Sequence, residues 1–295
     1  MILVTGPTGN TGKLIIEGLR QRRVPFVAMV RSNARQQELM AAGIPSVQAD
    51  FEQPHSLEAV LADVRPEKAY LVCAPDERLV RCERNFIHAA KAAGVRHIVK
   101  CGAYAAAHDS QSPNLRMHAA VEDALVSSNI PYTIIRPHGF MQTFFWMSAP
   151  LVMQHGILSY PAQDGPMPLI DVRDVGAALL KVLCELGHEN RTYNLTGPEP
   201  LRPSRMAEIL SESLNRPIRY VESSLDDLDA LMRQLGVPDA PREHVLWAFR
   251  EQAAGRFNYT SPDGPALGLR LRSFSDFAAD LAAGLTGAAT SDFRT

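Results

Sequence analysis

The sequence predicts an α/β protein in which helices cover both faces of a doubly wound parallel sheet. Up to Pro137, short apolar runs rich in β-branched residues alternate with segments whose apolar residues recur at helical spacing. The links between them are short, which is typical of parallel strands joined by right-handed helical crossovers. A turn with glycines at positions 6, 9 and 12 directly follows the first run. Because ligands bind beyond the carboxyl ends of the strands in such sheets, residues at these ends are the candidate site.

The first strand and helix show the pattern from which the other elements are assigned. Ile2–Thr5 is an apolar run that suits a buried parallel strand, and Lys13–Arg22 follows it with Leu14, Ile15 and Leu19 on one helical face. Further strands are predicted at residues 24–30, 46–49, 69–73, 97–101, 132–135 and 192–195. Further helices are predicted at residues 34–42, 56–61, 80–94 and 116–127. Later helices are predicted after 169–175 through Cys184, from Ser204 within 200–214, and at 224–235.

Composition excludes several classes of protein. The chain of 295 residues has 46% hydrophobic and 21% charged residues, with a formal net charge of −2. Such a balance provides no field that would attract nucleic acid or an anionic membrane, so we expect neither as a partner. The four cysteines form no CxxC pair and have no metal-ligand spacing, which favours a reducing cytoplasm and no metal. We expect no signal peptide and no membrane span, because a strand begins at once and no apolar stretch is long enough.

The glycine turn predicts a phosphate-binding loop for a dinucleotide. Gly6 allows a sharp bend after the strand, Gly9 allows the main chain to approach a pyrophosphate, and Gly12 allows the helix to pack closely on the strand. The N–H groups at the start of that helix would hold the phosphates. Short side chains that could donate to the same anion are Thr8, Asn10 and Thr11. An ordinary strand-to-helix turn that needs glycine is the alternative.

The ends of the second and third strands indicate which dinucleotide binds. An NAD site usually has Asp or Glu at the end of the second strand, whereas this chain has Arg31. Because a guanidinium fits a 2′-phosphate with two hydrogen bonds, NADP(H) is favoured over NAD(H). Asp50 and Phe51 end the third strand, where they could flank the adenine. A plain turn Asp is an equal alternative for Asp50.

The regular alternation ends after Pro137. We expect one NAD(P)-binding domain spanning 1–295, with a nucleotide core of about 1–140 plus 169–197 and a small substrate lobe of about 141–168 and 198–295. An aromatic stretch near the start of this lobe contains Phe140, Phe144, Phe145 and Trp146. It is interpreted as helix core or a face of a homodimer, or else as a lining for a flat apolar substrate.

Several motifs resemble those of the NmrA-like family of atypical short-chain dehydrogenases/reductases. They are residues 5–12 (TGPTGNTG), Arg31, residues 134–141 (IIRPHGFM), 170–175 (IDVRDV) and 193–199 (YNLTGPE). Within that family, residues 118–125 and 129–133 are similar to type 2 quinone oxidoreductases, triphenylmethane reductases and ergot-alkaloid dehydrogenases. The resemblance covers nearly the whole chain and implies a Rossmann-type fold, NADP(H) binding and a small C-terminal substrate lobe.

The resemblance also implies positions along the cofactor. Gly6 to Gly12 would hold the pyrophosphate, and Arg31 the 2′-phosphate. His118 stands where relatives place Lys or His against the nicotinamide ribose. Residues expected beside the ribose and nicotinamide are Ala74, Pro75, Gly102, Ala103 and Pro137.

One departure from the standard short-chain enzymes affects the chemistry. These enzymes use Tyr-x-x-x-Lys, in which the lysine lowers the pKa of a tyrosine that protonates a carbonyl oxygen. In this chain Tyr104 is followed four residues later by His108, and Gly102 stands at the position of the usual serine. A carbonyl–alcohol dehydrogenase is therefore not favoured. His118 could still orient the ribose or relay a proton, as Tyr104 could more weakly, although His118 could equally be structural.

Two functions fit these features. The first is an NADPH-dependent reductase that transfers a hydride to an electron-poor acceptor such as a quinone, an iminium or a conjugated cation, for which little proton donation is needed. The small aromatic or conjugated substrate would bind in a dry apolar pocket. The alternative is a non-catalytic redox sensor that binds NADP(H) and regulates a partner protein.

Overall fold

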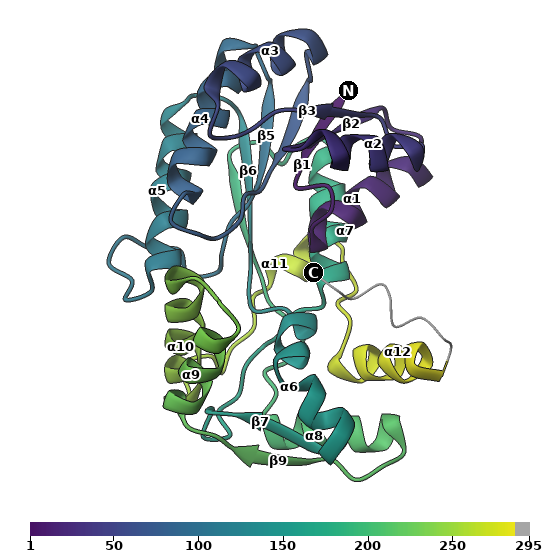
Figure 1. The fold of residues 1–295 in the computed structure, drawn as a ribbon, viewed down its shortest axis with the longest axis vertical. Helices are drawn as coiled ribbons and strands as arrows, with labels where there is room; N and C mark the ends of the chain where they lie inside the picture. The colour runs from purple at the N-terminus through teal and green to yellow at the C-terminus, as the bar shows by residue number, and fades with distance from the viewer. Residues whose placement is uncertain (287–295) are drawn as a thin grey trace. The chain divides into compact units, whose positions relative to one another are not determined.

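The computed structural model describes residues 1–286, which form two compact units. The first unit comprises Met1–Arg136 and Val175–Tyr193, and the second comprises Pro137–Asp174 and the chain from Asn194 onward. Figure 1 shows the elements of both units. The assignment of a nucleotide core and a substrate lobe to parts of the chain stays a prediction.

A seven-stranded sheet in the order β3-β2-β1-β4-β5-β6-β8 forms the first unit, which confirms the predicted doubly wound α/β fold. Neighbouring strands from β3 through β6 pair in parallel; Leu3, for example, lies opposite Val27 on one side and Ala69 on the other. The strand order reverses between β1 and β4, and ligands bind at this kind of switch point. The strands are β1 (Ile2–Thr5), β2 (Phe26–Val30), β3 (Ser46–Gln48), β4 (Lys68–Leu71), β5 (His97–Cys101), β6 (Tyr132–Pro137) and β8 (Arg191–Leu195).

Helices cover both faces of this sheet. On one face, Leu57, Phe86 and Val121 of three successive helices pack with strand residues in one buried apolar cluster. On the other face, a Cβ at Gly18 would lie 2.2 Å from Leu180 Cδ2, so the first and seventh helices pack closely there and a larger residue would require Leu180 to shift. The helices are α1 (Asn10–Gln21), α2 (Asn33–Ala41), α3 (Pro54–Val64), α4 (Leu79–Ala92), α5 (Pro113–Ser127) and α7 (Val172–Cys184).

The second unit has its own sheet and core. β7 (Ile157–Tyr160) pairs in parallel with β9 (Arg219–Glu222), and the sixth and eighth helices pack against this pair. The helices are α6 (Met141–His155), α8 (Pro203–Leu214), α9 (Leu225–Gln234), α10 (Asp239–Ala253), α11 (Asp263–Ala266) and α12 (Phe274–Thr286). Phe144 and Phe145 of α6 are buried in this core, which confirms the helix-core interpretation for them, whereas Trp146 is 44% exposed.

Candidate functional site

The loop between β1 and α1 has the backbone that the three glycines predict. Gly6 has a φ of +57°, which an L side chain rarely adopts, and a Cβ there would lie 2.7 Å from Val72 Cγ1. A Cβ at Gly12 would lie 2.1 Å from the Gly6 carbonyl oxygen, so the first turn of α1 can cross the loop only with glycine at this position. The Gly9 N–H closes the loop by donating to the Gly6 carbonyl at 3.0 Å.

The start of α1 presents unused donors beside this loop. Gly9 is the N-cap of α1 and has no side chain that could cap it, and Thr8, Gly9 and Asn10 are all exposed. The N–H groups of a first helical turn have no partner within the helix, so they can hold an anion. This cradle fits the pyrophosphate of a dinucleotide, because glycine leaves the space that a Cβ would fill.

The Thr11 hydroxyl differs from its predicted role as a donor to the anion. It forms a buried hydrogen bond of 2.6 Å with the Tyr70 hydroxyl on β4. While this bond is present, the side chain ties α1 to the sheet. A contact of Thr11 with a phosphate through its backbone N–H stays a prediction.

Arg31 follows β2 directly and points a free cation outward. Its side chain is exposed, and it forms no ion pair with any residue among 1–286, whereas Arg35 is paired with Glu38 at 2.7 Å. Its backbone carbonyl accepts a hydrogen bond from Gln48 of β3. Arg78 first, and Arg31 to a lesser extent, hold the pKa of Asp76 beyond β4 below its usual range. The charge of Arg31 is therefore available to a ligand at this edge of the sheet.

Asp50 and Phe51 form the turn between β3 and α3. Asp50 Oδ1 accepts from the Glu52 N–H at 2.9 Å, and the Asp50 N–H donates to Ser56 Oγ at 3.0 Å. The Phe51 ring is half-buried and packs edge-on against Phe86 of α4 at 5.7 Å. The structure thus gives Asp50 the turn role that was one of its two interpretations, and contact with an adenine stays a prediction.

A buried ion pair lies beneath the next two strand ends, and no sequence pattern predicted it. Lys100 Nζ of β5 lies 2.5 Å from Glu83 Oε2 of α4, and both side chains are fully buried. Glu83 Oε1 accepts from the Cys73 N–H at 3.1 Å, just before the exposed Ala74 and Pro75. Burial raises the pKa of Glu83, and the charge of Lys100 opposes that shift.

Gly102 occupies a position that cannot hold the usual serine without a shift of its neighbours. A Cβ at Gly102 would lie 2.8 Å from Glu122 Oε1 of α5. Glu122 is buried and forms a salt bridge with Arg136 of β6, whose Nε lies 3.1 Å and 3.2 Å from the two carboxylate oxygens. The Gly102 N–H donates to the Ile135 carbonyl at 2.8 Å. The packing of α5 on β6 therefore leaves no room for a serine side chain at position 102 unless Glu122 moves.

The two candidate catalytic residues both lie in the first unit. His118 is buried on α5, and Tyr104 is half-buried two residues after Gly102, with Ala103 between them. His108, at the position of the usual lysine, lies on the surface, where its Nε2 is 2.7 Å from Asp123 Oδ2. A Tyr–Lys pair is thus absent at Tyr104, as the sequence indicates.

An aromatic cluster in the second unit begins at the residue after β6. Pro137 ends β6, and the His138 ring that follows packs edge-on against Phe257 at 4.8 Å. Phe257 in turn contacts Trp247 of α10, on which His244 stacks with an interplanar angle of 22°. Burial, and then the nearby His244, lower the pKa of His138 to about 3. Its ring is therefore neutral near pH 7, and its Nδ1 accepts a hydrogen bond from the Gly139 N–H at 2.8 Å.

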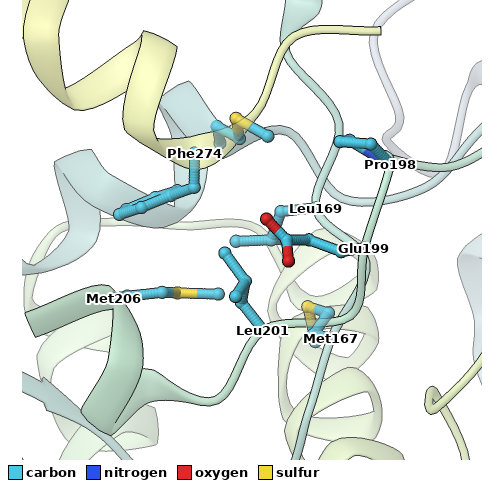
Figure 2. Close-up of a pocket in the computed structure, with 8 residues that line it drawn as sticks. Met167, Leu169, Pro198, Glu199, Leu201, Met206 and Phe274 are labelled. Atoms are coloured by element: carbon cyan, nitrogen blue, oxygen red, sulfur yellow. The ribbon is translucent and has the colours of Figure 1, made fainter. Parts of the chain in front are cut away.

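A shallow apolar pocket lies elsewhere in the second unit (Figure 2). Figure 2 shows the Glu199 carboxylate extending among the apolar side chains of Leu169 and Leu201. Glu199 is exposed, so its charge stays in contact with water. The other lining residues are Met141, Met167, Pro198, Met206 and Phe274.

The described residues 1–286 offer neither a metal-binding cluster nor a membrane-spanning helix. No group of three or more His, Cys, Asp or Glu in this part of the chain could hold a metal ion. No helix there is long and apolar enough to cross a membrane. All four cysteines are free thiols.

Comparisons with known proteins agree with this geometry. A model of the NmrA-like family matches residues 1–268. An NAD(P)H azoreductase of Xenophilus azovorans is 34% identical over 284 residues, covering 94% of this chain and 96% of the azoreductase. Quinone oxidoreductase 2 of Escherichia coli K12 is 34% identical over 247 residues, covering 81% and 83% of the two chains. The crystal structure of Citrobacter sp. triphenylmethane reductase complexed with NADP(H) matches with a TM-score of 0.83 at 28% identity, covering 95% and 99% of the two chains.

Proposed function

This chain belongs to the NmrA-like family, and from that premise we propose that it is an NADPH-dependent reductase of small, electron-poor organic acceptors. Its relatives are named for the reduction of azo compounds, quinones and triphenylmethanes. The chain is accordingly an NAD(P)H-dependent oxidoreductase. The observation that carries the proposal is the glycine cradle at α1 together with the unpaired Arg31 at the end of β2.

The first unit supplies the groups that hold the cofactor. When bound, NADPH provides the hydride. Backbone N–H groups at the start of α1 would hold the pyrophosphate, with Thr8 and Asn10 beside them. Arg31 would hold the 2′-phosphate, because its guanidinium is exposed and forms no ion pair with another described residue. Ala74, Pro75, Gly102 and Ala103 would border the ribose and nicotinamide, as in the sequence-based prediction.

The acid–base groups of this chain favour acceptors that need little help from a proton donor. His108 stands where the standard enzymes have the lysine of Tyr-x-x-x-Lys, so Tyr104 lacks the sequence partner that activates their tyrosine for proton transfer. Acceptors that are already electron-poor accept a hydride without simultaneous protonation of an oxygen. His118 would orient the ribose or relay a proton after the transfer. The chain would then act chiefly by orienting the reactants and excluding water.

We propose that the second unit binds the acceptor. In its aromatic cluster, the rings of His138 and Phe257 are buried, and those of Trp247 and Tyr259 are half-buried. The partly exposed rings would contact a flat conjugated molecule. The low pKa of His138 keeps this cluster free of a full positive charge near pH 7. A neutral apolar surface suits quinones and azo compounds, which carry no net charge.

The test is a turnover assay with the purified protein. NADPH would be mixed with a quinone, an azo dye, a triphenylmethane dye and an iminium, and the loss of absorbance at the NADPH band would be followed. We expect turnover with at least one acceptor, and slower turnover after Phe257→Ala. Calorimetric binding of NADPH without turnover of any acceptor would contradict the reductase and support the sensor.

Two further expectations stay predictions. A homodimer would use the outer side of α6, where Trp146, Leu151 and Met153 are 37–44% exposed; light scattering would measure the molar mass. The cytoplasmic location also stays a prediction, and it is supported only by the free cysteines.

A further inference from the structure

The first unit contains a cavity that the proposed reaction does not use. It lies between α1 and α2, which run beside each other in Figure 1, and it has a volume of about 390 Å³. Cavities of a few hundred Å³ are typical of small-molecule sites. The lining residues are Pro7, Thr8, Lys13, Ile16, Glu17, Arg20, Gln21, Leu39 and Ile44.

α2 borders the cavity and is attached to β3 by side-chain hydrogen bonds. None of the side chains of α2 is buried. Gln36 Nε2 of α2 donates to the Ser46 carbonyl at 2.9 Å, and Ser46 Oγ donates to the Gln36 carbonyl at 3.2 Å. These two bonds fix the helix at the edge strand. Leu39 and Ile44 are left half-exposed at the cavity, so a ligand could bury them further.

The walls combine apolar surface with uncompensated positive charge. Lys13, Glu17 and Arg20 are spaced to lie on one face of α1. Lys13 and Arg20 form no ion pair with any residue of the described chain, whereas Glu17 accepts a hydrogen bond from Gln21 at 3.2 Å. Two cations and one carboxylate leave a net charge of +1 at the cavity. Ile16, Leu39, Ile44 and the ring of Pro7 provide the apolar part.

We propose that this cavity binds a small amphiphile with an apolar body and one anionic group, such as an aromatic carboxylate or sulfonate. The apolar body would lie against Leu39 and Ile44, and the anion would pair with Lys13 and Arg20. This site adjoins the cofactor site at Pro7 and Thr8 of the phosphate loop, but none of its other lining residues is assigned to NADPH.

The experiment uses the whole protein with saturating NADP⁺, which fills the dinucleotide site and does not fluoresce. The probe is 8-anilinonaphthalene-1-sulfonate, and its neutral analogue N-phenyl-1-naphthylamine serves as the comparison. We expect saturable binding of one sulfonate per chain in the presence of NADP⁺. The double variant Lys13→Gln/Arg20→Gln should raise the Kd of the sulfonate about tenfold, because the charged contacts are lost. The Kd of the neutral analogue should not change.

Matched variants locate the probe. Leu39→Trp fills the cavity and should abolish binding, whereas Met40→Trp, one residue along α2 and 59% exposed, should not. Arg84→Gln/Lys91→Gln on α4 removes two exposed cations elsewhere and should have no effect. Displacement of the sulfonate by NADP⁺ would overturn the proposal, as would binding that Leu39→Trp leaves intact. These outcomes do not depend on turnover, so they are independent of the proposed function.

Discussion

Lys100 of β5 and Glu83 of α4 form an ion pair of 2.5 Å from which water is excluded. The other oxygen of Glu83 accepts a hydrogen bond from the Cys73 N–H. The Glu83 carboxylate therefore connects Lys100 of β5 with the backbone that follows β4. The ends of these two strands precede Ala74 and Gly102, which are expected to border the cofactor. The buried Glu83 carboxylate therefore helps to position the backbone next to Ala74 at the candidate site.

Breaking this pair on one side should be costly. Lys100→Met leaves a buried carboxylate without its cation, so the free energy of unfolding should fall by about 3–5 kcal/mol. The double variant Lys100→Met/Glu83→Gln removes both charges and keeps an acceptor for the Cys73 N–H. Its loss in free energy of unfolding should be clearly smaller than the sum of the losses in the two single variants. Urea unfolding followed by circular dichroism measures these values, and additive losses would show that the two charges are not coupled.

Restoring the serine of the standard short-chain enzymes should not restore their chemistry. Gly102→Ser introduces a Cβ at 2.8 Å from Glu122 Oε1, so we expect a loss of about 1–3 kcal/mol in the free energy of unfolding. We expect no alcohol dehydrogenase activity, because the lysine is still missing. Ala103→Ser, at the half-buried next position, is the control. A Gly102→Ser variant as stable as this control would mean that Glu122 moves freely.

Arg31 should decide between the two dinucleotides. Arg31→Ala removes the predicted partner of the 2′-phosphate, so the Kd for NADPH should rise about tenfold to a hundredfold, with the Kd for NADH nearly constant. Arg35→Ala is the matched control, because Arg35 is already paired with Glu38. Isothermal calorimetry measures both constants. If the Kd values of NADPH and NADH rose equally, Arg31 would contribute to dinucleotide binding in general and not to recognition of the 2′-phosphate.

Asp174 should make stability fall as the pH rises from about 4 to 6. Burial is the main cause that raises its pKa from 3.8 to about 6 in the folded chain, although the Arg272 N–H donates to its Oδ2 at 2.8 Å. The folded state therefore retains a proton that the unfolded chain releases near pH 4. Asp174→Asn cannot titrate, so its stability relative to the parent should increase by about 1–3 kcal/mol between pH 4 and pH 6. A difference that stays constant over this range would contradict the raised pKa.

The sequence predicted those parts of the site that are local in the chain. Gly6, Gly9 and Gly12 lie within one turn between a strand and a helix, so their spacing alone indicates the loop. Arg31 was identifiable because it directly follows an apolar run. β1 and β5 were predicted with their observed bounds, since buried parallel strands appear as continuous apolar runs.

The parts that depend on tertiary packing could not be predicted in this way. Glu83 and Lys100 lie on different elements, and nothing in either helix or strand pattern indicates that they are buried together. The cluster around His138 needs Phe257, which is far along the chain. The bounds of α6 were not predicted, because its apolar residues occur almost all round the helix and Pro150 lies inside it, so no helical face stands out. The Thr11 bond to Tyr70 likewise depends on how α1 packs on the sheet.

The chain leaves the first unit after Arg136, returns at Val175 and leaves again after Tyr193. On the ribosome, the six strands β1–β6 therefore emerge well before α7, whose Leu180 packs on Gly18 of α1. Until α7 is synthesised, the side of α1 that contains Gly18 cannot pack against α7. A gene fragment that stops at Arg136 would therefore encode every strand-end residue assigned to NADPH in the first unit and still lack part of the fold that supports them.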